Sequence, residues 1–184
     1  MHAMASEPHH AGNASSRKVA EYILANLRRW GWKAEIERFD VLLPYPGQRR
    51  LEMLSPRPYL ASLREPAIGQ DADTNDANQL PTFNAYGGDG DVTAPLVYVN
   101  YGTPEDYKAL EAMGVSVKGK VVIARYGHCW RGIKANLAQE RGALGCLIYS
   151  DPADDGYSKG PTYPEGAYRP PQGVQRGTVM DMPI

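Results

Sequence analysis

The sequence predicts a mixed α/β fold, and the region between residues 96 and 149 carries most of that prediction. Short apolar runs typical of buried strands alternate there with two segments of helical pattern, and these runs cover residues 96–101, 121–124 and 146–149. Such alternation is typical of βαβ-like units. The first helix is expected to begin with Thr103 as N-cap and Pro104 in its first turn. The second is expected to run from near Arg131 to about Gly142.

The N-terminal region predicts one helix and one strand. Apolar residues recur at helical spacing after Ser15 and Ser16, either of which is a suitable N-cap, and Gly31 ends the pattern. Residues 32–43 then alternate between apolar and polar with one change of phase, as in a strand with a bulge or a strand that is covered on both faces. One helix and one strand are too little to form a domain alone. Residues 64–91 are polar and rich in turn formers, which indicates a surface loop.

Composition limits the classes of partner. The chain has 184 residues, with 20 Lys and Arg against 21 Asp and Glu, so its net charge is −1. This balance gives no general electrostatic signal for nucleic acid or for an anionic membrane, and charge-based recognition must therefore be local. No apolar stretch approaches the roughly 20 residues that span a bilayer, and residues 1–16 lack the apolar core of a signal peptide.

The segment ARYGHCWRGIK, residues 124–134, concentrates basic side chains after a buried-looking run. Arg131 and Lys134 fall in the first turn of an expected helix, where the dipole is already positive and acidic residues are usual. An anion such as a carboxylate or a phosphate would relieve that repulsion and would be held by both dipole and guanidinium. The alternative is a solvated basic face whose aliphatic stems cover Trp130. Both interpretations remain open on the residues alone.

Other combinations of reactive residues give weaker signals. His128 and Cys129 are adjacent, so in an extended chain they point to opposite sides, and no thiol-protease signature surrounds them. His9 and His10 have no carboxylate-rich partner set downstream and indicate an exposed turn rather than metal ligands. The segment QGVQRGTV places glycines around Arg176, where backbone can approach a ligand closely, yet such turns are common.

Several segments, in order, resemble the glutamate carboxypeptidase II family, which includes the N-acetylated-α-linked acidic dipeptidases. They are PHHAG, FDVLLPYPG, LVYVNYGTPEDY, the block GKVVIARYGHCWRGIKANLAQERGALGCLIYSDPADDG, YPEG and GVQRG. The resemblance covers almost the whole chain, and the block 119–156 is its most specific part. It implies a zinc exopeptidase in which a β-rich protease-associated (apical) domain with short flanking helices is inserted into the peptidase domain.

The resemblance also implies a division of the chain. Residues 1–46 would be the first helix and strand of the peptidase domain, and residues 47–184 most of the inserted domain. Two zinc ions, their ligands and the catalytic Glu would lie outside the chain, so the expected catalytic and metal-ligand sets of this chain are empty. A homodimer and a secreted, periplasmic or extracellular location are further implications of the family.

Two site residues follow from the resemblance. Arg131 occupies the position of the family's arginine that binds the α-carboxylate of the C-terminal residue of a peptide substrate. Thr178 stands where the glutamate-specific members have an Asn that also holds the terminal glutamate, which weakens the expectation of glutamate preference. The alternative function is a non-catalytic binding or scaffold module of the transferrin-receptor-like superfamily. Arg131 favours the peptidase, because such a module needs no guanidinium for a peptide C-terminus.

Overall fold

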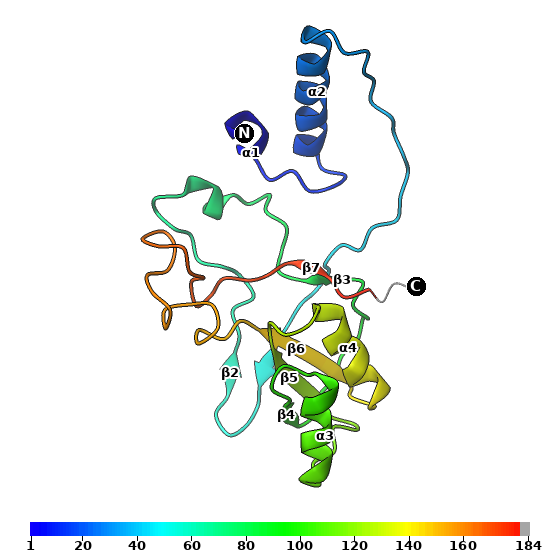
Figure 1. Ribbon diagram of the computed structural model, residues 1–184, viewed down its shortest axis with the longest axis vertical. Coiled ribbons are helices and arrows are strands. Elements are labelled where there is room, and N and C mark those ends of the chain that lie inside the picture. Colours follow the sequence, from blue (N-terminus) through cyan, green and yellow to red (C-terminus); the bar gives the residue numbers. More distant parts are fainter. Residues whose placement is uncertain (181–184) are drawn as a thin grey trace. The chain divides into compact units, whose positions relative to one another are not determined.

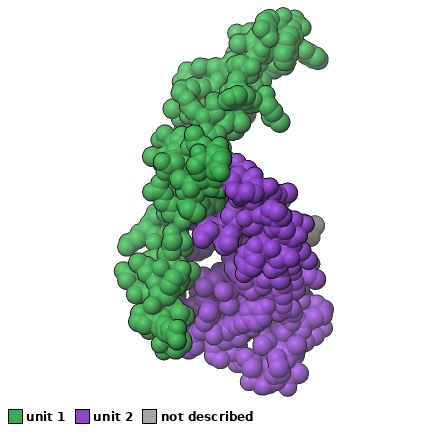
Figure 2. Space-filling view, turned by 90° about the vertical axis from the view of Figure 1, so that its left-hand side faces the viewer, with its two compact units in different colours: residues 1–81 green, residues 82–184 purple. Residues whose placement is uncertain are grey.

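The computed structural model describes residues 1–180, which fall into two compact units. The first unit comprises residues 1–81 and the second begins at Thr82 (Figure 2). The boundary predicted after residue 46 differs from this division and stays a prediction about the family's domain arrangement. None of the helices in the described residues is long and apolar enough to cross a membrane.

The first unit contains the predicted amphipathic helix. A short helix, α1 (His2–Ala5), precedes α2 (Ala14–Arg29). The side chain of Asn13 caps α2 by accepting a hydrogen bond of 2.7 Å from the backbone N–H of Ser16. The helix is confirmed, but the prediction of Ser15 or Ser16 as N-cap is wrong. Asn is an equally good cap, and here it comes first.

The strand predicted over residues 32–43 is not present. That segment is irregular, and its large apolar side chains are exposed, with 67% exposure for Trp32, 71% for Phe39 and 99% for Leu42. A strand exists only where a second backbone pairs with it, and no described strand pairs with this segment. The unit's sheet is instead the antiparallel pair β1 (Glu52–Met53) and β2 (Tyr59–Leu60), followed by the 3₁₀ turn η1 (Ala72–Asn75).

The second unit contains the predicted βαβ arrangement, which confirms the α/β class. Three parallel strands lie in the order β4 (Leu96–Tyr98), β5 (Val121–Arg125) and β6 (Gly145–Tyr149), as Figure 1 shows. The connecting helices are α3 (Pro104–Ala112) and α4 (Arg131–Glu140). All five elements lie at the predicted places.

One face of this sheet carries the core. The core consists of buried side chains from the strand segments, from both helices and from one connecting loop. They are Val99, Val122 and Ala124 of the strand segments, Tyr107 of α3, Ala138 of α4 and Val117 of the loop. Both helices therefore cover the same face of the sheet. Thr103 and Asp106 form a capping box that fixes where α3 begins. The parallel strands bring the ends of β4 and β5 and the start of α4 to one edge, where the site lies.

A second, two-stranded sheet was not predicted. β3 (Asn84–Ala85) pairs in parallel with β7 (Gly177–Thr178), with Asn84 opposite Gly177 and Ala85 opposite Thr178. The backbone N–H of Val179 extends the pairing by donating to the carbonyl of Ala85 at 2.9 Å. This ladder joins the predicted surface loop to the glycine-containing segment near the end of the described chain.

Candidate functional site

The start of α4 is an open helix N-terminus. Trp130 is its N-cap residue and makes no capping side-chain hydrogen bond, and the first turn contains no acidic residue. α3, by contrast, has both a capping box and two acidic residues in its first turn. The N–H of Ile133 donates to the carbonyl of Trp130 at 3.1 Å, and the two N–H groups before it, at residues 131 and 132, are the ones suited to an anion.

Gly132 determines how the tryptophan lies over this turn. A β carbon at position 132 would be 2.7 Å from Cε3 of the Trp130 ring. Any side chain there would displace the indole, since such contacts do not occur between real atoms. The WRG sequence thus brings an aromatic ring, a glycine and a guanidinium together at the first turn.

Arg125, the first basic residue of the cluster, is engaged by carboxylates. Its guanidinium lies 2.8 Å from Asp154 and 3.3 Å from Asp151, and 4.6 Å from the ring centre of Tyr101. The pKa of Asp151 is lowered mainly by the hydrogen bond from the N–H of Ala153; the charge of Arg125 also lowers it. Arg125 is therefore part of an ion-pair network that stabilises the carboxyl edge of the sheet.

His128 and Lys134 are engaged as well. The ring of His128 lies over that of Tyr101, with 3.8 Å between centroids. Lys134 is fully buried, and its ammonium donates to the carbonyls of Tyr101 at 2.5 Å and Gly127 at 2.8 Å, with Sγ of Cys129 at 3.4 Å. The expectation that Lys134 adds a cation to an anion site is therefore wrong. That expectation was based on the position of Lys134 in the helix alone. Helix position does not reveal that the long side chain turns inward and donates to backbone carbonyls.

Arg131 differs from the other three. Its guanidinium lies against Gly177 so closely that a β carbon at position 177 would be 2.6 Å from Cζ. Its Nε is buried without a hydrogen-bond partner, and no carboxylate of residues 1–180 forms an ion pair with it. Of the two arginines and the lysine in the cluster, Arg125 is paired with carboxylates and Lys134 with backbone carbonyls, whereas Arg131 has neither kind of partner among the described residues.

Thr178, the second sequence-predicted site residue, is the neighbour along β7 of Gly177, the residue that Arg131 contacts. Its hydroxyl accepts a hydrogen bond of 3.0 Å from the backbone N–H of Met180. The hydroxyl of Tyr126 donates to the carbonyl of Gln175 at 3.1 Å and helps to hold this segment near the cluster. A substrate-binding role for Thr178 stays a prediction.

The sequence did not indicate two features near Arg131. They are the pairing of Asn84 with Gly177 and the contact between Gly177 and the Arg131 guanidinium. Asn84 lies in a segment without periodicity, and two-residue strands leave no periodic signal. The sequence GVQRGT did mark Gly177 as a place of close backbone approach, although it did not reveal that the approaching group is a side chain of the same chain.

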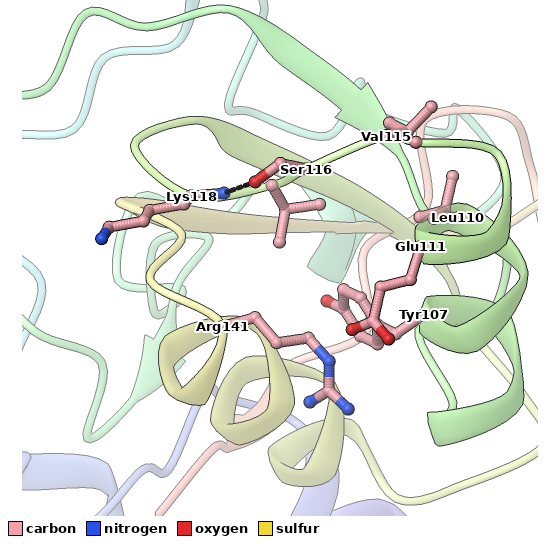
Figure 3. Close-up of a pocket in the computed structure, with 9 residues that line it drawn as sticks. Tyr107, Leu110, Glu111, Val115, Ser116, Lys118 and Arg141 are labelled. Carbon is pink, nitrogen blue, oxygen red and sulfur yellow. Dashed lines mark hydrogen bonds between the residues drawn. The ribbon is translucent and has the colours of Figure 1, made fainter.

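A pocket of about 430 Å³ lies at the opposite end of α4 (Figure 3). Its lining includes Tyr107, Glu111, Ser116, Lys118 and Arg141. The Arg141 guanidinium lies 4.4 Å from the Tyr107 ring centre and donates to the carbonyl of Leu137 at 3.1 Å. With that arginine engaged and a carboxylate on its wall, this pocket is less suited to an anion than the Arg131 site.

Comparisons with known proteins agree with the resemblance of the sequence segments. Residues 92–182 match the family model of the PA domain. A probable glutamate carboxypeptidase of Arthroderma benhamiae is 38% identical over 90% of this chain and 24% of its own length. The aminopeptidase NAALADL1 of Rattus norvegicus is 32% identical over 97% of this chain and 25% of its own length. The chain belongs to the glutamate carboxypeptidase family. It corresponds to the N-terminal portion and spans about a quarter of these relatives.

The fold is also similar to that of a solved structure. An aminopeptidase from Aneurinibacillus sp. strain AM-1 matches 96% of this chain and 32% of its own chain, with a TM-score of 0.52 and 20% identity. At that identity the likeness shows the fold alone. Within the glutamate carboxypeptidase family, the cluster around Arg131 lies inside the PA domain match.

The zinc ions that the family implies find no ligand set in the described residues. Residues 1–180 contain no group of three or more His, Cys, Asp or Glu side chains that could hold a metal ion. A catalytic zinc site needs at least three such ligands. The described residues therefore do not fit a zinc centre.

Proposed function

We propose that this chain is the N-terminal and PA-domain part of a zinc-dependent exopeptidase, and that Arg131 binds the free C-terminal carboxylate of the peptide substrate. The observation that supports the proposal is the state of Arg131. Its guanidinium lies on the glycine backbone of β7, its Nε has no partner, and no described carboxylate neutralises it. A buried or half-buried cation of this kind is stabilised by an anion, and the proposal assigns that role to the carboxylate of a bound peptide.

A carboxylate fits this site better than the amino terminus of a peptide. The planar guanidinium can engage both carboxylate oxygens, and the uncapped N–H groups of α4 add partial positive charge. An ammonium group would be repelled by both. Relatives named as aminopeptidases occur beside those named as carboxypeptidases, and the charge of Arg131 favours the carboxypeptidase type for this chain.

The remaining steps of hydrolysis would be carried out elsewhere in the peptidase. We propose that the zinc ions, whose chemistry is to polarise the scissile carbonyl and activate water, are held by residues outside this chain. The contribution of this chain is to bind and orient the peptide end. The remainder of the peptidase, a second copy in a homodimer, and a secreted, periplasmic or extracellular location are further parts of the proposal, based on the resemblance.

A nuclear magnetic resonance titration of the ¹⁵N-labelled 184-residue chain tests the binding claim. Acetyl-Ala-Gly and its C-terminal amide are matched ligands that differ in the carboxylate. The free acid is expected to shift the Nε–H resonance of Arg131 and the N–H signals of residues 131–133, while the amide leaves them nearly unchanged. Arg131→Lys should weaken acid binding about three- to tenfold, because an ammonium cannot engage both oxygens. Equal shifts with acid and amide would refute carboxylate recognition.

A further inference from the structure

Asn84 lies beside the Arg131 guanidinium. In the parallel β3–β7 pair, Asn84 is the register partner of Gly177. Side chains of paired residues in neighbouring strands project from the same face of a sheet. Gly177 has no side chain, and the guanidinium of Arg131 takes up the space where one would be. The Asn84 carboxamide and the guanidinium are therefore neighbours on one face of this small sheet.

Both neighbours contain a buried polar atom that lacks a partner. These atoms are Oδ1 of Asn84 and Nε of Arg131, and neither has a hydrogen-bond partner among the described residues. Buried polar atoms in native proteins are nearly always paired, and an unpaired one needs an explanation. Two such atoms of opposite type, an acceptor and a donor, on one face of the same ladder indicate a shared missing partner.

Hydrogen bonds fix the backbone around Asn84. Its own carbonyl accepts from the N–H of Gly87 at 3.4 Å, and the following residue, Ala85, accepts from the N–H of Val179 at 2.9 Å. Thr178, the residue predicted from sequence, is one position further along β7. Because successive side chains of a strand alternate, its position belongs to the other face. Of the two, Asn84 is the residue that shares a face with Arg131.

We propose that Asn84 is a second ligand-binding residue of this site, and that its Oδ1 accepts the N–H of the terminal residue whose carboxylate Arg131 binds. This inference rests on the proposed function. A C-terminal peptide residue carries a carboxylate and an N–H on the same α carbon. The carboxylate can accept from Nε of Arg131, and the N–H can donate to Oδ1 of Asn84. The site then recognises an N-acylated amino acid with a secondary amide, and it discriminates against a terminal proline or N-methyl residue, which has no N–H to donate.

The experiment compares two free acids that differ by this hydrogen alone, namely acetyl-Ala-Gly and acetyl-Ala-sarcosine. Their dissociation constants are measured by titration of the ¹⁵N-labelled 184-residue chain. The variants are Asn84→Ala, Arg131→Ala and Asn78→Ala, where Asn78 is exposed and serves as the matched control. The wild-type chain should bind acetyl-Ala-Gly about three- to tenfold more tightly than acetyl-Ala-sarcosine, the scale of one neutral hydrogen bond.

Asn84→Ala should abolish this preference by weakening acetyl-Ala-Gly alone, while Asn78→Ala keeps it. The sarcosine ligand controls for folding, because a misfolded variant would lose both ligands. If Arg131→Ala removes binding of both acids but Asn84→Ala retains the full preference for the N–H, the assignment of Asn84 is wrong and the carboxylate proposal stands. If Arg131→Ala leaves binding of both acids unchanged, or if the wild-type chain binds neither acid, the proposed function itself fails, and the role of Asn84 fails with it.

Discussion

At the scale of single residues, Lys134 shows how the structure separates four basic side chains that look equivalent in the sequence. Its ammonium is fully buried and donates to two backbone carbonyls in the turns that lead into α3 and α4. A buried lysine with these contacts supports the backbone instead of meeting a ligand. The guanidinium of the neighbouring Arg131 lies instead against the glycine of β7, and we propose that it binds an anion.

Lys134→Ala is expected to lower the free energy of unfolding by about 2–5 kcal/mol, because it leaves a cavity and two carbonyls without a donor. Urea denaturation followed by circular dichroism measures this change. Lys108→Ala, on the exposed side of α3, is the control and should stay within about 0.5 kcal/mol of wild type. A Lys134 variant as stable as the control would show that the buried contacts do not support the fold.

The two cysteines should react differently with iodoacetamide. Both thiols are half-buried, but Cys146 packs against the core and burial raises its pKa to about 11, whereas Cys129 lies in the turn before α4. The thiolate is the reactive form, so Cys146 should remain unmodified in the native chain at pH 8 and react as the pH rises toward 11. Mass spectrometry should find one modified cysteine in native protein and two in urea. Native labelling of Cys146 as fast as in urea would contradict its burial.

At the scale of elements, the sequence was informative where elements are long and periodic. The three parallel strands and two helices between residues 96 and 149 lie where their apolar spacing and the Thr103 cap placed them. The strand expected at 32–43 failed because alternation does not reveal whether a partner backbone exists. β3 and β7 were not predicted, because a strand of two residues is too short to show an alternating pattern. The contact between Arg131 and Gly177 of β7 was therefore not predicted either. The placement of cations at a helix N-terminus drew attention to both Arg131 and Lys134, and the structure separates the two, while the substrate-binding role of Arg131 stays a prediction.

Gly177→Ala tests that missed contact. The added β carbon would overlap the Arg131 guanidinium and force it away from β7. We expect the variant to fold and to lose affinity for acetyl-Ala-Gly at least tenfold, as Arg131→Ala would. Gly88→Ala, at a glycine with open space around its α carbon, should bind like wild type. If Gly177→Ala binds the acid with wild-type affinity in the same titration, the packing of Arg131 on β7 is not needed for the site.

At the scale of the whole molecule, the first unit of the chain exposes large apolar side chains. Trp30, Trp32 and Phe39 are more than 60% exposed there, together with Leu42. Apolar exposure of this kind fits a surface that packs against further structure, which agrees with a chain spanning about a quarter of its relatives. We propose that this further structure is the rest of the peptidase, which would supply the hydrolytic centre opposite the Arg131 site.

A double comparison of kcat/KM in that peptidase tests the central claim most directly. Wild type and Arg131→Ala are assayed on one peptide as the free acid and as its C-terminal amide. Arg131→Ala should lower kcat/KM for the acid by the equivalent of at least about 1–3 kcal/mol, the scale of a charge-assisted hydrogen bond, and change the amide little. Loss of the same factor on both substrates would contradict the account and would make Arg131 a structural residue.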